Sequence, residues 1–440
     1  QAFLARIEQV NPSINAIHQV DPEKLLQQAK VADDAVQTKK FLGKLHGVPI
    51  SIKDTCFVKG FKVGSGYPGL IQKADKDATV IQRLKQAGAI ILGITNVPEF
   101  LSSYETSNRI HGTTNNPYDL TRTPGGSSGG EAALIAAGGS TLGLGSDAGG
   151  SIREPAHYCG ICGHKPTQNL VSTKGGSFPI DGGNGIIHSI LAIGPMARDI
   201  DDLALMLEII AGTDELDPHV ATLQFKMPKN TDLKQLKIAY YFENPKSPPC
   251  EETIATINQV ISALKDFGIH SEHNFPQHVD QVYQLHWETY MLSRGETIKA
   301  VLREFQDNTP TSLIKRFVEQ AENCKLNSAE VYQRLRESEI FRYQMLQWMH
   351  DNAYDILISP VTSTPARLHN TTFDHIYDYQ YVYLHNLTGW PATVVPIRLT
   401  KRGLPIGIQI AAKPWHDHLC FSIAKYLQDF FGKLGIADKF

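Results

Sequence analysis

The sequence contains few cysteines, has no excess of basic charge and lacks any long apolar run. Six cysteines in 440 residues are too few for a disulfide scaffold. Such sparse usage is typical of a reducing compartment and predicts a cytoplasmic protein. Lysine and arginine number 42 against 45 acidic residues, and this balance argues against a nucleic-acid partner. No apolar stretch approaches the roughly 18–20 residues that span a bilayer.

The chain has the composition of an ordinary globular protein. Hydrophobic residues make up 42% and charged residues 20%, which excludes wholesale disorder. A length of 440 residues exceeds a typical domain of about 100–200 residues, so several domains or one large core are allowed. Residues 1–7 resemble the middle of an amphipathic helix without a preceding cap. An upstream signal or membrane anchor therefore stays open.

Hydrophobic patterning predicts an α/β core. Asp77 is placed to cap a short amphipathic helix that Gly88 ends, and the apolar run 89–94 then predicts a buried strand. A helix followed by a buried strand is typical of layered α/β proteins. Three further strands are predicted at residues 45–52, 355–360 and 406–410.

The middle of the chain differs from both ends. Residues 213–350 carry many charged, long side chains in amphipathic helical patterns. We therefore predict a core built from residues 1–212 and 351–440, with 213–350 as a variable helical section. This section is expected either to line a substrate pocket or to form a partner surface.

Two short segments rich in glycine and serine are the strongest functional signal. Residues 124–130 and 145–153 together contain seven glycines and four serines. Glycine beside a nucleophile lets a backbone N–H face a developing oxyanion without a Cβ in the way. The structural alternative is a pair of flexible loops, but such loops seldom include a single Asp and a single Arg among their glycines.

Other catalytic and metal-binding patterns fit poorly. The spacing G-x-S-x-G occurs within 125–130, but a nucleophile elbow must follow a buried strand, and the preceding residues are polar. The S-x-x-K match at 312–315 lacks its companion motifs. Cys159 and Cys162 have ligand spacing without a second pair, so no metal site is predicted. Catalysis by a serine paired with a lysine far away in the sequence has no short motif, so this alternative stays open.

Several segments together resemble the signature of the amidase signature family. The resemblance is specific because many motifs occur in the family's order, over residues 1–212 and 351–440. It implies one amidase domain over 1–440, in the α/β class, with a central mixed β-sheet flanked by helices. The segments that carry it are residues 47–54, 93–96, 115–119, 125–130, 147–153, 163–167, 386–392 and 403–409.

The resemblance implies a Ser–cis-Ser–Lys triad and no cofactor. Carried over by motif, Ser151 is the nucleophile, Ser127 the bridging serine after a cis peptide, and Lys53 the base. An ordinary lysine titrates near pH 10.4, so Lys53 needs burial or nearby positive dipoles to act as a base. Its place after an apolar run suits burial, and the alternative is an ion pair with Asp54 at a strand end.

The resemblance also implies an oxyanion hole and supporting residues. The oxyanion donors are the N–H groups of Ala148, Gly149, Gly150 and Ser151. Asp147 and Arg153 are expected to order the loop. Ser128 is expected either near the lysine or as the cap of a helix that begins near Glu131. Two departures from the family pattern, Ser146 for Thr and Asn169 for Gly, leave the triad untouched.

Details of the sequence favour hydrophobic amides as substrates. Residues 104–112, 163–166 and 416–419 resemble the fatty acid amide hydrolase 2 branch, which implies a small-molecule substrate with a hydrophobic or fatty acyl group. A glutamine-hydrolysing A subunit of a tRNA-dependent amidotransferase is the alternative, but residues 189–195 replace its usual polar pair with apolar ones. A catalytically silent binding protein is a third hypothesis. Membrane contact and a homo-oligomer stay open.

Overall fold

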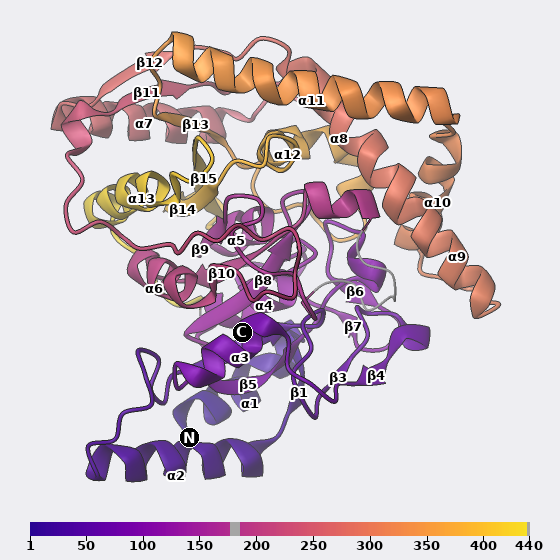
Figure 1. Ribbon diagram of the computed structural model, residues 1–440, viewed down its shortest axis with the longest axis vertical. Helices are drawn as coiled ribbons and strands as arrows, with labels where there is room; N and C mark the ends of the chain where they lie inside the picture. Colours follow the sequence, from indigo (N-terminus) through magenta and orange to yellow (C-terminus); the bar gives the residue numbers. More distant parts are fainter. Residues whose placement is uncertain (177–184, 438–440) are drawn as a thin grey trace.

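A computed structural model describes residues 1–176 and 185–437 (Figure 1). The described residues form one mixed sheet of eleven strands. The chain is thus a mixed α/β protein with a large central sheet, as the sequence predicts. In their order across the sheet the strands are β1 (Ile17–Val20), β5 (Ile90–Thr95), β2 (Pro49–Lys53), β8 (Leu142–Asp147), β10 (Ala192–Ala197), β9 (Cys162–Lys165), β14 (Ala392–Leu399), β15 (Pro405–Ala412), β13 (Ile356–Pro360), β11 (Lys237–Tyr240) and β12 (His270–His273).

Helices flank this sheet, and two small hairpins lie apart from it. Figure 1 shows α11 running across the top of the view, with α9 and α10 descending at its right. The hairpins pair β3 (Lys62–Val63) with β4 (Gln72–Lys73) and β6 (Ser107–Asn108) with β7 (Gly112–Thr113). The helices are α1 (Ala2–Ile14), α2 (Pro22–Gln37), α3 (Thr79–Gln86), α4 (Gly129–Ala136), α5 (Arg153–Cys159), α6 (Ile200–Ile210), α7 (Glu251–Phe267), α8 (Val282–Tyr290), α9 (Glu296–Glu304), α10 (Ser312–Asn323), α11 (Ser328–Asp351), α12 (Gln380–Leu387) and α13 (Asp417–Phe431).

Strands β2 and β8 bring two distant segments to one edge of the sheet. They pair in parallel, with Ile52 opposite Leu144. Both residues are fully buried, because helices cover both faces of this part of the sheet and only apolar side chains fit there. Since neighbouring parallel strands end at the same edge, Lys53 at the end of β2 comes close to the glycine-rich segment that follows β8.

Several local expectations require correction. Asp77 does not cap α3, whose N-cap position is Ala78; its carboxylate instead accepts from the Lys59 N–H at 2.7 Å and from the Lys85 ammonium. The strand expected at 45–52 begins only at Pro49, because residues 45–48 form a turn. Helix α4 begins at Gly129, which agrees with the helix expected to start near Glu131.

The section 213–350 is not purely helical. It supplies β11 and β12, which pair in parallel with each other, while β11 also pairs in parallel with β13. These strands are only four residues long, so the helical patterns around them dominate the sequence signal. In the described residues, every helix is too short or too polar to be a candidate membrane span.

Candidate active site

Lys53 lies at the end of β2 with its ammonium group fully buried beside two serines. Its Nζ atom donates to Ser127 Oγ at 2.8 Å and to Ser146 Oγ at 2.9 Å. It makes no ion pair with Asp54, whose carboxylate accepts the backbone N–H of Gly64 at 2.9 Å. The structure therefore joins the lysine to the glycine–serine segments rather than to its neighbour in sequence.

Burial lowers the pKa of Lys53 to about 7, although the carboxylates of Asp147 and Glu131 act in the opposite direction. At pH 7 about half of the lysine is then neutral and able to accept a proton, against well under 1% for an ordinary lysine. Glu131 is itself buried beneath the site and accepts hydrogen bonds from Ser51 and, at 2.7 Å, from Thr95. Burial raises the pKa of Glu131 to about 7.

The loop that carries Ser127 is held at its backbone by a second buried carboxyl group. The Gly126–Ser127 peptide is cis. The Gly126 N–H donates to Glu154 Oε2 at 2.9 Å, and burial raises the pKa of Glu154 well above its usual range. On the other side, the Ser128 N–H donates to the Ser151 carbonyl oxygen at 3.2 Å. This bond fixes the two serine-bearing loops against each other.

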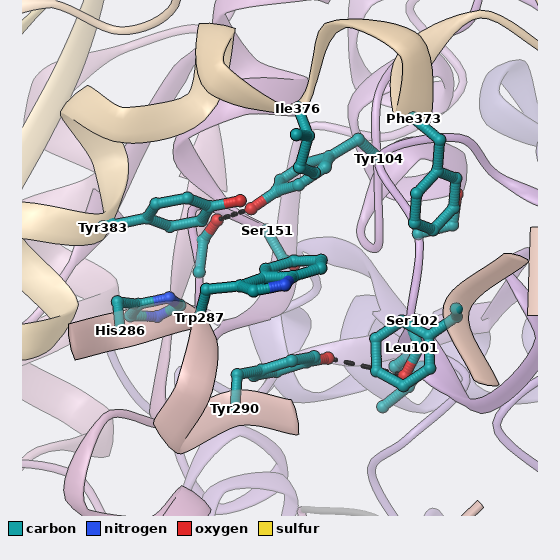
Figure 2. A pocket seen from close by; sticks show the side chains of 13 residues that line it. Leu101, Ser102, Tyr104, Ser151, His286, Trp287, Tyr290, Phe373, Ile376 and Tyr383 are labelled. Carbon is teal, nitrogen blue, oxygen red and sulfur yellow. Dashed lines mark hydrogen bonds between the residues drawn. The ribbon is translucent and has the colours of Figure 1, made fainter. Parts of the chain in front are cut away.

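Ser151 lies between β8 and α5 and lines a pocket (Figure 2). Within the part of the chain that the structure describes, its hydroxyl has no hydrogen-bond partner. The side chains of Ser127 and Ser151 are therefore not hydrogen-bonded to each other. Ser128 occupies the N-cap position of α4, but its side chain makes no capping hydrogen bond. Its hydroxyl instead donates at 3.4 Å to the Ser146 carbonyl oxygen, which also accepts from Lys53.

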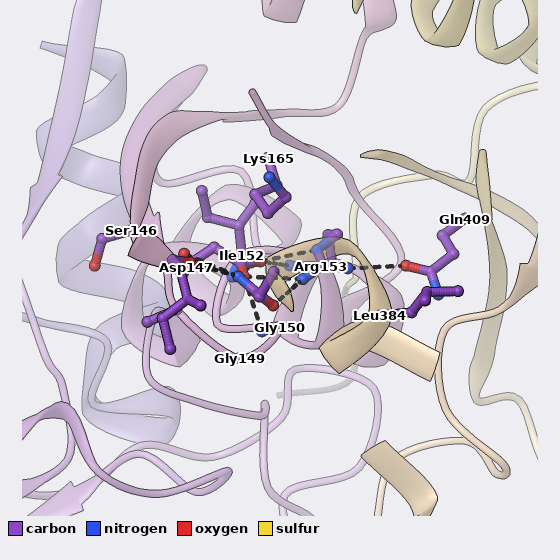
Figure 3. Close-up of polar contacts among 12 residues, drawn as sticks. Ser146, Asp147, Gly149, Gly150, Ile152, Arg153, Lys165, Leu384 and Gln409 are labelled. Atoms are coloured by element: carbon purple, nitrogen blue, oxygen red, sulfur yellow. Dashed lines mark hydrogen bonds and ion pairs between the residues drawn. The ribbon is translucent and has the colours of Figure 1, made fainter. Parts of the chain in front are cut away.

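We use "oxyanion loop" for residues 147–151, the segment predicted to bind an oxyanion. Asp147 within this loop and Arg153 at the start of α5 order its backbone (Figure 3). Asp147 Oδ1 accepts the Gly150 N–H at 2.8 Å and pairs with the Arg153 guanidinium at 3.0 Å, both side chains being fully buried. Burial alone would raise the pKa of Asp147, but Arg153 holds it below its usual range. Arg153 also donates to Gln409 at 3.1 Å, which links the loop to β15.

The four backbone groups expected as oxyanion donors are not equivalent. The Gly150 N–H is already engaged by Asp147. Among the described residues, the N–H groups of Ala148, Gly149 and Ser151 have no protein acceptor. These three groups therefore stay free for a ligand oxygen, whereas Gly150 serves the loop's own structure.

The pocket wall is mainly apolar and aromatic, and ten of its thirteen lining residues lie outside the sequence motifs. No Asp, Glu, Lys or Arg is among its lining residues. Four of them come from the section 213–350, where the aromatic residues within 283–290 are the one sequence feature that could have indicated a pocket wall. Figure 2 shows these rings around Ser151. The lining residues are Leu101, Ser102, Ser103, Tyr104, Gly149, Ser151, His286, Trp287, Tyr290, Phe317, Phe373, Ile376 and Tyr383.

A buried lysine–serine pair beside a glycine loop, on a mixed α/β sheet, is compatible with an enzyme that hydrolyses amides through a serine. The family model described as "Amidase" matches residues 1–421. The chain belongs to the amidase signature family and is an amidase, as the sequence motifs predict.

Relatives in sequence and structure agree with this assignment. Human fatty-acid amide hydrolase 2 is 33% identical, over 100% of this chain and 87% of its own length. The A subunit of the glutamyl-tRNA(Gln) amidotransferase of Fusobacterium nucleatum is 30% identical, over 99% and 93%. A solved structure of fatty acid amide hydrolase superposes with a TM-score of 0.88 at 25% identity, over 99% of this chain and 82% of the other.

Proposed function

We propose that this amidase hydrolyses carboxylic amides with apolar acyl groups through an acyl-enzyme on Ser151. The observation that carries the proposal is the 2.8 Å hydrogen bond from the buried Lys53 ammonium to the Ser127 hydroxyl. A lysine with a pKa of about 7 can take a proton from that hydroxyl near neutral pH. Ser127 then becomes the acceptor for the proton of Ser151.

The proposed reaction uses the Lys53–Ser127 hydrogen bond and requires the Ser151 hydroxyl to come within hydrogen-bonding distance of Ser127 when substrate is bound. Ser151 Oγ attacks the amide carbon and passes its proton to Ser127, while the proton of Ser127 moves to Lys53. The carbonyl oxygen becomes an oxyanion that accepts from the free N–H groups of the oxyanion loop, of which one donor is typically worth about 3–4 kcal/mol. Collapse returns a proton to the nitrogen, which leaves as ammonia or an amine. Water then attacks the ester by the same route and releases the acid.

The lining of the pocket favours a substrate with an apolar acyl group rather than glutamine. A zwitterionic amino acid needs charged partners when it is buried. The lining contains none, and burial lowers the pKa of His286 to about 4, so this residue is neutral at pH 7. The similarity to human fatty-acid amide hydrolase 2 points in the same direction. The alternative, a glutamine-hydrolysing A subunit, is represented among relatives of about 30% identity.

Covalent labelling and a substrate panel test the proposal. A fluorophosphonate should modify Ser151 in the intact protein, as located by peptide mass spectrometry, and Ser151→Ala should abolish both labelling and turnover. Ser140→Ala is the matched control, because Ser140 is buried and donates only to the Leu142 carbonyl at 3.0 Å. Turnover should increase from acetamide to long-chain and aryl amides. Glutaminase activity would favour the A-subunit alternative, and no turnover of any amide would favour a silent binding protein.

A further inference from the structure

Two carbonyl oxygens of the oxyanion loop are held by pocket side chains to which the sequence motifs give no role in the loop. The Nε2 atom of His286, on α8, lies 2.8 Å from the Ala148 carbonyl oxygen. The Tyr104 hydroxyl donates to the Gly149 carbonyl oxygen at 2.6 Å, and Figure 2 shows this bond. Consecutive peptides of the loop are thus held by a residue of α8 and by a residue of the loop that precedes β6.

The chemistry of His286 suits a hydrogen-bond donor rather than a base. Because a carbonyl oxygen only accepts, Nε2 must carry the ring proton. Burial lowers the pKa of His286 to about 4, so the ring is neutral at pH 7. Its Nδ1 atom is buried and has no partner among the described residues. A leucine would fill this wall without an unpaired buried nitrogen, so what histidine adds is the Nε2–H bond to Ala148.

Stacking fixes both donors. The His286 ring lies face to face with Tyr383, with centroids 4.3 Å apart, and the Tyr104 ring lies face to face with Tyr379 at 3.7 Å. A Cβ at Gly149 would lie 3.2 Å from His286 Cε1 and 3.3 Å from the Tyr104 hydroxyl oxygen. A methyl group at position 149 would therefore displace both donors by a few tenths of an ångström.

The direction of each carbonyl determines the direction of the next N–H. In a trans peptide the C=O and N–H groups point in opposite directions. With the Ala148 carbonyl held toward α8, the Gly149 N–H points to the opposite side, where it has no acceptor among the described residues. With the Gly149 carbonyl held by Tyr104, the Gly150 N–H points to Asp147 and donates at 2.8 Å.

We propose that His286 and Tyr104 are positioning residues that hold the oxyanion loop so that the Gly149 N–H faces the reacting carbonyl oxygen. The inference rests on the proposed function, since it requires Ser151 to be the nucleophile. In this role neither side chain touches the reacting atoms, and both act through the backbone. The helical section 213–350 thereby contributes to the chemical step as well as to the pocket wall.

Three variants test the inference. His286→Leu removes the donor, His286→Gln keeps an amide N–H able to reach Ala148, and Tyr104→Phe removes only the hydroxyl. A misdirected oxyanion donor loses part of the roughly 10²–10³-fold contribution of an intact one, so we expect kcat to fall at least about tenfold in His286→Leu and several-fold in Tyr104→Phe. KM should stay within about twofold, and His286→Gln should recover most of the loss.

Inhibitor affinity separates positioning from simple damage to the pocket. A trifluoromethyl ketone adds to the serine and places an oxyanion in the loop, whereas the alcohol of equal chain length only fills the pocket. Affinity for the ketone should fall by the same factor as kcat/KM, and affinity for the alcohol should not change. Equal losses for both inhibitors, or unchanged ketone affinity, would overturn the inference.

Ser151→Ala distinguishes failure of this inference from failure of the proposed function. If Ser151→Ala keeps its turnover, both are wrong, because the reaction does not occur at this loop. If Ser151→Ala is inactive while the positioning variants keep wild-type kcat, only the positioning role is wrong. Should His286→Leu not fold, Tyr104→Phe decides the outcome, because phenylalanine preserves the stacking on Tyr379.

Discussion

The glycine–serine loops of the core and the helical section 213–350 meet at one pocket, yet they are stabilised by different interactions. The loops are held by buried ions and backbone hydrogen bonds, such as the Asp147–Arg153 pair and the Gly126 N–H on Glu154. The helical wall is held by rings: Trp287, for example, has its centroid 6.3 Å from that of Phe317. Directional bonds fix atoms for chemistry, whereas aromatic packing tolerates changes in shape. Substitutions in the two regions should therefore affect different kinetic constants.

The largest effect is expected at the base. Lys53→Met should lower kcat/KM by at least about 10³-fold, because general-base catalysis by a positioned group contributes about 10²–10⁴-fold. The measurement is steady-state hydrolysis of an apolar anilide. Activity within tenfold of wild type would show that Lys53 is not the base.

Lys165→Met is the matched control for Lys53→Met. Lys165 is also fully buried on a strand, and burial lowers its pKa to about 7. Its ammonium donates to the Pro166 carbonyl at 2.8 Å rather than to a serine. The control should lose stability without losing fluorophosphonate labelling of Ser151. Equal loss of labelling in both variants would contradict the distinction between the two lysines.

Adjacent glycines in the oxyanion loop should separate stability from catalysis. Gly150 has a φ of 101°, and a Cβ there would lie 2.4 Å from Val382 Cγ2. Gly150→Ala should therefore lose about 2–4 kcal/mol of unfolding free energy, from backbone strain and overpacking. Gly149→Ala meets only the tips of side chains and should keep most stability while kcat falls. The measurements are the free energy of unfolding in urea and kcat for both variants. Equal losses of unfolding free energy would contradict the separation of stability from catalysis.

A substitution in the helical wall should affect binding of the acyl group. Trp287→Ala should raise KM for a long-chain amide about tenfold, because it removes a large apolar surface from the pocket, while kcat stays within about twofold. KM for acetamide should barely change. Trp348→Ala is the control, because Trp348 lies on α11 and packs on Tyr354 outside the pocket. A fall in kcat without a change in KM would place Trp287 in the chemical step.

The core loops could be predicted from the sequence because their constraints are local. Glycine at 150 is required by its positive φ, and Asn169 likewise adopts a φ of 65°, a conformation that asparagine tolerates. Four of the eleven strands, β2, β5, β13 and β15, could be predicted as apolar runs, although β2 begins later than expected. A local backbone requirement of this kind restricts which residue type can occupy the position, so it can be recognised in the sequence.

The helical wall could not be predicted because its contacts are made only by the tertiary fold. His286 bonds to Ala148, 138 residues earlier in the chain, and no spacing rule connects them.

Two residues of the core also have roles that depend on distant partners. Ser146 departs from the family pattern, but its hydroxyl accepts a hydrogen bond from Lys53. Asp77 has a side chain suited to capping a helix, but its carboxylate accepts hydrogen bonds from Lys59 and Lys85 instead. In each case the partner, and not the residue type, sets the role.

The smallest effect is expected from the carboxyl group beneath the lysine. Because Lys53 must be neutral to accept a proton and its pKa is about 7, kcat/KM of the wild type should increase as pH rises through about 7. The negative charge of Glu131 raises the pKa of Lys53. Glu131→Gln removes this charge, so the acid limb should move to lower pH, by less than about one unit. Both groups are buried, so the shift should persist at high ionic strength. An acid limb that moved to higher pH, or a shift abolished by salt, would show that the loops and the lysine are not coupled through this buried carboxyl.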